Sequence, residues 1–139
     1  MDTTPKNIKM CEMAKEIQEG WVDFWEEGDW YATSLKGKRL VFSSSGRDTR
    51  VPRFINAQGK HDGEIWLPRQ DQLQGMMEYQ NQAYLLDNFN KFVSNLWKRA
   101  SYFAKPETSL EQLWLAYVMH EKFNKVWNEK QEEWVEVNL

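Results

Sequence analysis

Residues 28–68 read GDWYATSLKGKRLVFSSSGRDTRVPRFINAQGKHDGEIWLP, and this stretch decides the fold class. Short apolar or β-branched runs alternate in it with turn-forming clusters at Gly37, 43–46, 56–59 and 62–63. This alternation is typical of antiparallel strands joined by hairpins. The expected strands are Asp29–Leu35, Arg39–Ser43, Val51–Ile55 and Glu64–Leu67.

The residues before this stretch have helical periodicity. Thr4-Pro5 is typical of an N-cap followed by the first residue of a helix, and Gly20 is typical of a helix end. One N-terminal helix is therefore expected between them. Its buried side is predicted to consist of apolar residues three or four positions apart, namely Ile8, Cys11, Ala14, Ile17 and Trp21.

The second half of the chain is also predicted to be helical. Pro68 disfavours helix at Leu67, so a helix capped by Asp71 is expected to follow. A longer amphipathic helix then comes after the polar break at 80–82. Its expected apolar stripe consists of Leu85, Phe89, Phe92, Leu96 and Ala100, widened by Leu86, Val93 and Trp97.

A third helical segment is expected to begin after Pro106. Ser109 and Gln112 match an S-x-x-Q capping box, and apolar residues continue the helical pattern as far as Val126. The alternation in 134–137 predicts a last short strand or a docked tail.

These elements predict an α+β fold. We expect a small antiparallel β-meander of three or four strands, about residues 29–67, packed against an N-terminal helix and two or three C-terminal helices. With 139 residues, the chain is expected to form a single domain over 1–139, because two cores would each bury too little surface. An apolar fraction of 41% with 14% aromatic residues predicts that the chain folds.

Cysteine content and hydropathy bear on the compartment. The single cysteine, Cys11, allows no intramolecular disulfide, which is typical of a reducing environment. The longest apolar run, Leu113–Met119, is too short to cross a bilayer, and the first residues lack the pattern of an export signal. The prediction is a cytoplasmic protein with no membrane partner.

Residue types that carry catalysis are few. Cys11 lies on the predicted apolar stripe, which favours a buried, inert thiol. His61 lies in a predicted turn, which favours a solvated histidine over a general base. His120 and Glu121 begin an H-E-x-x-H pattern, but the second histidine is absent because position 124 is Asn124. Common hydrolase, P-loop and dinucleotide motifs do not occur, so no catalytic residue, metal ligand or cofactor is predicted. An enzyme with an unrecognised site stays open, since acid and base groups often meet only in three dimensions.

Charge is unevenly distributed along the chain, whose net charge is −3. Residues 1–35 carry three basic against eight acidic side chains, residues 36–63 seven against two, and residues 64–139 eight against eleven. The basic residues of the two predicted hairpins are candidates for binding an anion or a partner: Lys38, Arg39, Arg47, Arg50, Arg53 and Lys60. The alternative is that they pair with the acidic N-terminal helix and discourage aggregation at strand edges.

Tryptophan is abundant, with eight residues in the chain. Trp21, Trp25 and Trp30 cluster around the first helix and strand and cannot share one helical face, so some of them are candidates for an exposed protein interface. The alternative is that they build a tryptophan-rich core.

Three segments carry a resemblance. The sequences EIWLPRQDQLQ at 64–74, EQLWLAYVM at 111–119 and KVW at 125–127 resemble small proteins encoded in phages and prophages of Gram-positive bacteria. The resemblance covers the second half and the N-terminal helix. It implies a phage or mobile-element setting in a bacterial host cell, and it supplies no catalytic residue to carry over.

Three functions are consistent with the sequence. The favoured one is a non-enzymatic interaction protein that binds a host or phage protein through exposed aromatic residues and Arg47, Arg50 and Arg53. The alternative is a nucleic-acid or nucleotide binder that uses the same basic hairpins, although a pI of about 5.5 argues against a dedicated DNA-binding protein. The third is an enzyme whose site no sequence motif reveals. The sequence indicates no oligomeric state.

Overall fold

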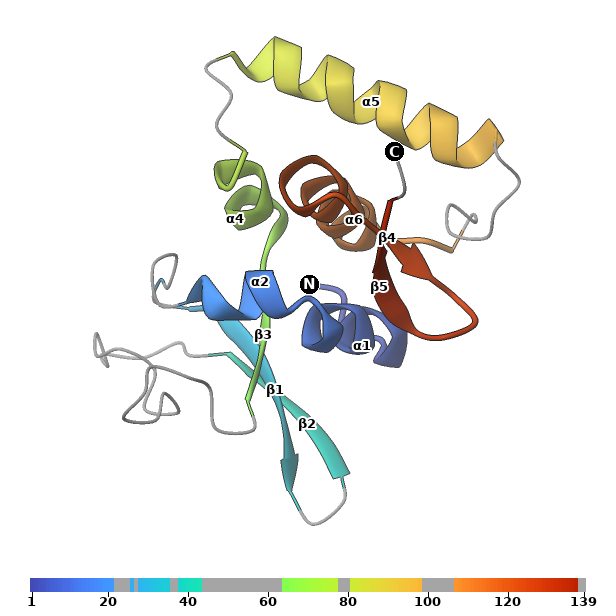
Figure 1. Ribbon diagram of the computed structural model, residues 1–139. Coiled ribbons are helices and arrows are strands. Elements are labelled where there is room, and N and C mark those ends of the chain that lie inside the picture. Colours follow the sequence, from blue (N-terminus) through green and yellow to red (C-terminus); the bar gives the residue numbers. More distant parts are fainter. Residues whose placement is uncertain are drawn as a thin grey trace. The chain divides into compact units, whose positions relative to one another are not determined.

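The computed structural model of the chain describes residues 1–21, 26, 28–35, 38–43, 64–77, 81–98 and 107–137, with the backbone alone at 34, 35, 38–40, 42, 97 and 98. It is an α+β structure, as predicted (Figure 1). The chain divides into two compact units. The N-terminal unit holds Met1 and Thr3–Arg69, and the C-terminal unit holds Asp2 and Gln70–Leu139. The single domain stays a prediction.

The N-terminal helix begins where the sequence predicts. Thr4 caps α1 (Pro5–Met13), and its Oγ1 accepts a hydrogen bond from the backbone N–H of Asn7 at 3.3 Å. The apolar stripe is confirmed, since its members are at most 4% exposed: Ile8, Cys11, Ala14, Ile17 and Trp21.

The expectation of one unbroken helix is wrong, because the chain leaves helical geometry at Ala14, where ψ is 74°. The carbonyl of Cys11 accepts from the N–H of Ala14 (3.2 Å) and from Nε2 of Gln18 (3.0 Å). These donors occupy the acceptor that a continuous helix would offer to residue 15. A separate helix α2 (Lys15–Glu19) follows and ends at Gly20.

Among the residues that the structure describes, the sheet of the N-terminal unit has three strands in the order β2-β1-β3. Strands β1 (Trp30–Leu35) and β2 (Lys38–Ser43) form the first predicted hairpin, and β3 (Ile65–Leu67) pairs antiparallel with β1 on its other side (Figure 1). This order differs from a simple meander, in which each strand neighbours the next. The predicted strand Val51–Ile55 lies outside the described residues.

An aromatic core joins helix and sheet in this unit. The rings of Trp21 and Trp66 stack with centroids 6.0 Å apart, and Tyr31 lies 6.2 Å from Trp21. Helix α1 packs against β3. Both indoles are at most 1% exposed, so the tryptophans supply much of the buried apolar surface here.

The C-terminal unit contains α4 (Gln70–Gly75), α5 (Gln82–Lys98) and α6 (Leu110–Phe123). The expected cap at Asp71 is wrong, because α4 already includes Gln70 and Asp71 lies in its first turn. The break before α5 is confirmed, and Oδ1 of Asn81 accepts from the N–H of Ala83 at 2.8 Å. Leu86 does not widen the buried stripe, since it is 54% exposed.

Only part of the predicted capping box forms at α6. Ser109 Oγ accepts from the N–H of Gln112 at 3.2 Å. The Gln112 side chain donates to the carboxylate of Asp2 at 2.8 Å. The helix is central to its unit, and its buried residues are Gln112 and the run from Trp114 to Met119.

The expectation that α6 continues to Val126 is wrong. Asn124 adopts the left-handed conformation (φ 55°, ψ 42°) and ends the helix, as short polar residues can at little steric cost. The chain then forms β4 (Lys125–Asn128), which pairs antiparallel with β5 (Glu133–Glu136). The last strand was expected, whereas its partner was not. Trp127 and Trp134 lie opposite each other across the hairpin, with ring centroids 5.2 Å apart.

Candidate functional site

A groove of about 400 Å³ lies between α5 and α6 in the C-terminal unit. Each lining residue of helix α5 lies three or four positions from another, which puts them on one side of the helix. Helix α6 contributes one turn near its C-terminal end. The lining residues are Tyr84, Asn88, Lys91, Phe92, Asn95, Tyr117, His120 and Glu121.

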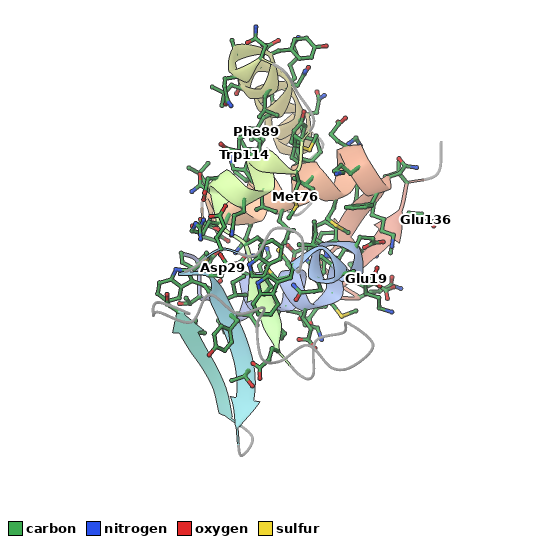
Figure 2. The ribbon with its side chains drawn as sticks, turned by 90° about the vertical axis from the view of Figure 1, so that its left-hand side faces the viewer. Glu19, Asp29, Met76, Phe89, Trp114 and Glu136 are labelled. Atoms are coloured by element: carbon green, nitrogen blue, oxygen red, sulfur yellow. The ribbon has the colours of Figure 1, made fainter. Side chains whose placement is uncertain are left out.

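Stacked rings hold the two helices together beside the groove. Phe89 of α5 lies parallel to Trp114 of α6, with centroids 3.8 Å apart and planes inclined by 2° (Figure 2). Phe89 also meets the edge of Tyr117 at 5.7 Å. Because Trp114 and Tyr117 are almost fully buried, these contacts fix one wall of the groove to the core of the unit.

The floor of the groove is aromatic. The ring of Phe92 lies 5.3 Å from that of Tyr117 and 5.2 Å from that of His120. Phe92 and His120 are half-buried, so part of each ring is accessible from the groove. Tyr84 is 60% exposed at the rim. The floor and rim can therefore receive an apolar or aromatic side chain.

Two asparagines on α5 provide polar groups that line the same groove. Asn88 is half-buried and Asn95 is exposed. Neither side chain has a hydrogen bond to any residue that the structure describes. Each amide offers an acceptor oxygen and two N–H donors, so both are available to a ligand.

The charged side chains of the groove have partners on the same helix. Lys91 forms an ion pair with Asp87, with Nζ 2.9 Å from Oδ2. The hydrogen bond to Asp87, and secondly the negative charge of Asp87, raise the pKa of Lys91. Nδ1 of His120 lies 3.2 Å from a carboxylate oxygen of Glu121. Counting histidine as neutral, the lining residues together with Asp87 leave one net negative charge, that of Glu121.

A second polar cluster lies in the N-terminal unit, around Asp29. This carboxylate is 0% exposed and accepts from Nε1 of Trp21 (3.2 Å), the N–H of Glu26 (3.1 Å) and the guanidinium of Arg69 (3.0 Å). Arg69 also pairs with Glu26 at 2.6 Å. These partners lie within the unit and stabilise the buried charge, which indicates a structural role.

The predicted aromatic sites are only partly accessible. Trp21 is 1% exposed, so its assignment to an exposed interface is wrong: the indole stacks on Trp66 and its N–H is taken by Asp29. Trp30 is half-buried at the start of β1, and Trp25 lies outside the described residues.

The predicted basic sites are described only in part. The backbones of Lys38 and Arg39 lie in β2, opposite Leu35 and Ser34 of β1. The other four lie outside the described residues: Arg47, Arg50, Arg53 and Lys60. Their use in binding stays a prediction.

Residues considered for catalysis contribute little to the groove. Cys11 is buried in the other unit, as predicted for an inert thiol, and His61 lies outside the described residues. His120 alone among them lines the groove. In the part of the chain that the structure describes, no cluster of three or more His, Cys, Asp or Glu side chains could hold a metal ion. Across the same residues, no helix has both the length and the apolar character needed to span a membrane.

Sequence reasoning missed the groove, although one signal for it was present. Asn88 and Asn95 are seven positions apart on the helix with the clearest amphipathic pattern. They flank Phe92 on the side that turns toward α6. Such a polar pair beside an apolar stripe usually marks the solvent-exposed border of a helix face. Only the position of α6 shows that these residues line a groove.

Comparison of the chain with models of known protein families, with curated protein sequences and with solved structures finds no match.

Proposed function

We propose that this protein is a non-enzymatic interaction protein of the cytoplasm, which binds a segment of a partner protein in the groove between α5 and α6. One observation carries the proposal: aromatic rings fixed to the core by Trp114 and Tyr117 line the same groove as two asparagine amides that bond to no described residue. Aromatic anchors surrounded by polar groups are typical of protein interfaces.

The size of the groove supports a short segment as its ligand. About 400 Å³ is at the lower end of the range for sites that enclose small ligands, and it suits one or two side chains of a peptide. The resemblance to phage and prophage proteins supports a partner from the host or the phage.

The test is selection of peptides from a random nine-residue library on the purified protein, followed by titration of the selected peptides. Tyr84→Ala and Phe92→Leu are expected to weaken binding by about tenfold or more, because aromatic anchors dominate interface energies. Asn90→Ala, on an exposed part of α5 outside the groove, is the matched control and should leave affinity unchanged. Selection of no peptide, or of peptides equally bound by both groove variants, would refute the proposal.

A second candidate function is anion or nucleic-acid binding by the basic segment 36–63, whose seven basic against two acidic side chains favour it. Reversing the charge of Arg47, Arg50 and Arg53 to Glu should abolish binding of a single-stranded oligonucleotide. Wild-type affinity should fall steeply as salt rises. Equal binding by the triple variant would rule out these residues.

A further inference from the structure

Two amides that bond to no residue the structure describes, together with the residual charge of the groove, point to one class of ligand. We infer that the groove binds a peptide segment in polyproline II conformation, with Asn88 and Asn95 bonding to its backbone and a basic side chain of the peptide near Glu121. This inference rests on the proposed function and specifies its ligand.

The chain itself shows how a side-chain amide binds an extended backbone. Gln18 donates from Nε2 to the carbonyl of Trp66 at 2.9 Å and accepts from the N–H of Trp66 at 2.8 Å. Two hydrogen bonds to one residue fix the position of its backbone without regard to its side chain. Asn88 and Asn95 carry the same group and line the groove.

The spacing of the two asparagines selects the peptide conformation. Seven residues of helix rise about 10.5 Å and return to nearly the same face. One turn of polyproline II takes three residues and rises about 9.3 Å, so residues i and i+3 present their backbones in the same direction. A β-strand repeats its orientation every two residues, or about 6.7 Å, which fits the spacing less well.

The floor lies between the two amides. Phe92 is four residues after Asn88 and three before Asn95, and its ring contacts His120. A peptide whose backbone is hydrogen-bonded by both asparagines would direct one intervening side chain onto these rings. The net negative charge left by Glu121 favours a basic neighbour and disfavours an anionic ligand such as an oligonucleotide or an acidic peptide.

The probes for the test are the best-bound peptides selected from the nine-residue library, titrated by fluorescence anisotropy. Asn88→Ala and Asn95→Ala are each expected to weaken binding by about fivefold to fiftyfold, because each removes two hydrogen bonds to the peptide. Asn90→Ala is the control, and circular dichroism confirms that each variant is folded. Glu121→Gln should weaken binding of basic peptides and reduce its dependence on salt.

Replacing the peptide's backbone amides one at a time with N-methylated amides identifies which N–H groups are hydrogen-bonded to the protein. The expected result is a loss of affinity at two positions three residues apart. Losses at alternate positions would overturn the polyproline II conformation, and selection of acidic peptides or displacement by an oligonucleotide would overturn the assigned charge.

Other outcomes separate this inference from the proposed function. If Phe92→Leu weakens binding while both asparagine variants bind as wild type, the backbone contact is overturned and the peptide-binding function stands. If the wild type binds no peptide, the function itself fails. A dimer in sedimentation that Asn88→Ala dissociates would identify a second copy as the ligand and overturn the inference.

Discussion

The side-chain amide of Gln18 pairs with both backbone groups of Trp66, at 2.8 and 2.9 Å. Trp66 lies in β3, and among the described strands β3 has one neighbour, β1. A side chain of α2 therefore occupies backbone groups that face away from β1. This contact ties the second helix to the edge of the sheet.

Replacing Gln18 with alanine should lower the free energy of unfolding by about 2–3 kcal/mol, because the backbone groups of Trp66 and the carbonyl of Cys11 lose a partner. Urea denaturation followed by tryptophan fluorescence measures the change. Gln82→Ala, at the exposed first residue of α5, should have little effect. A loss below about 0.5 kcal/mol for Gln18→Ala would show that these bonds do not stabilise the fold.

The buried pair of Asp29 and Arg69 should also be important for stability. Arg69→Met leaves the fully buried Asp29 carboxylate without its cation, and a loss of about 3 kcal/mol is expected. A double-mutant cycle with Asp29→Asn should give a coupling energy of about 1–3 kcal/mol. The exposed pair of Asp87 and Lys91 is the control, for which denaturation should resolve no coupling. Additive effects at Asp29 and Arg69 would contradict the prediction.

The stack of Phe89 on Trp114 should hold α5 against α6. Phe89→Ala is expected to cost about 3 kcal/mol and to speed hydrogen exchange of the α5 amides, since the ring contacts both Trp114 and Tyr117. Leu86→Ala, on the exposed side of the same helix, should leave exchange unchanged. Equal exchange in the two variants would mean that α5 is held by other contacts.

The left-handed residue that ends α6 should tolerate glycine but not a β-branched residue. Asn124→Val is expected to cost about 1–2 kcal/mol, because the side chain is strained at a φ of 55°. Asn124→Gly relieves that strain and loses only the bond to the carbonyl of Val137. Thermal unfolding compares the two variants, and similar midpoints would argue against strain at this position.

Much of the secondary structure could be predicted because its signals are local. Thr4 and Ser109 cap helices at the expected positions, and the apolar stripe from Ile8 to Trp21 is buried as predicted. The first hairpin and the strand at 65–67 also follow from runs of apolar residues bounded by turns.

The errors arose where contacts distant in sequence compete with local patterns. The break at Ala14 involves Gln18, which also bonds to Trp66 forty-eight residues later. The end of α6 at Asn124 depends on pairing with a strand that begins at Glu133. Trp21 is a candidate both for the buried stripe and for an exposed interface, and its burial rests on stacking against Trp66, forty-five residues later.

The order of residues alone determined the α+β class, the helix caps and the apolar stripes, since capping and periodicity act over a few neighbouring positions. The tertiary structure decided that β3 joins β1, that Asp29 is buried with Arg69, and that α5 and α6 enclose a groove. These features depend on side chains that meet only after the chain has folded, and no local pattern encodes which of them will meet.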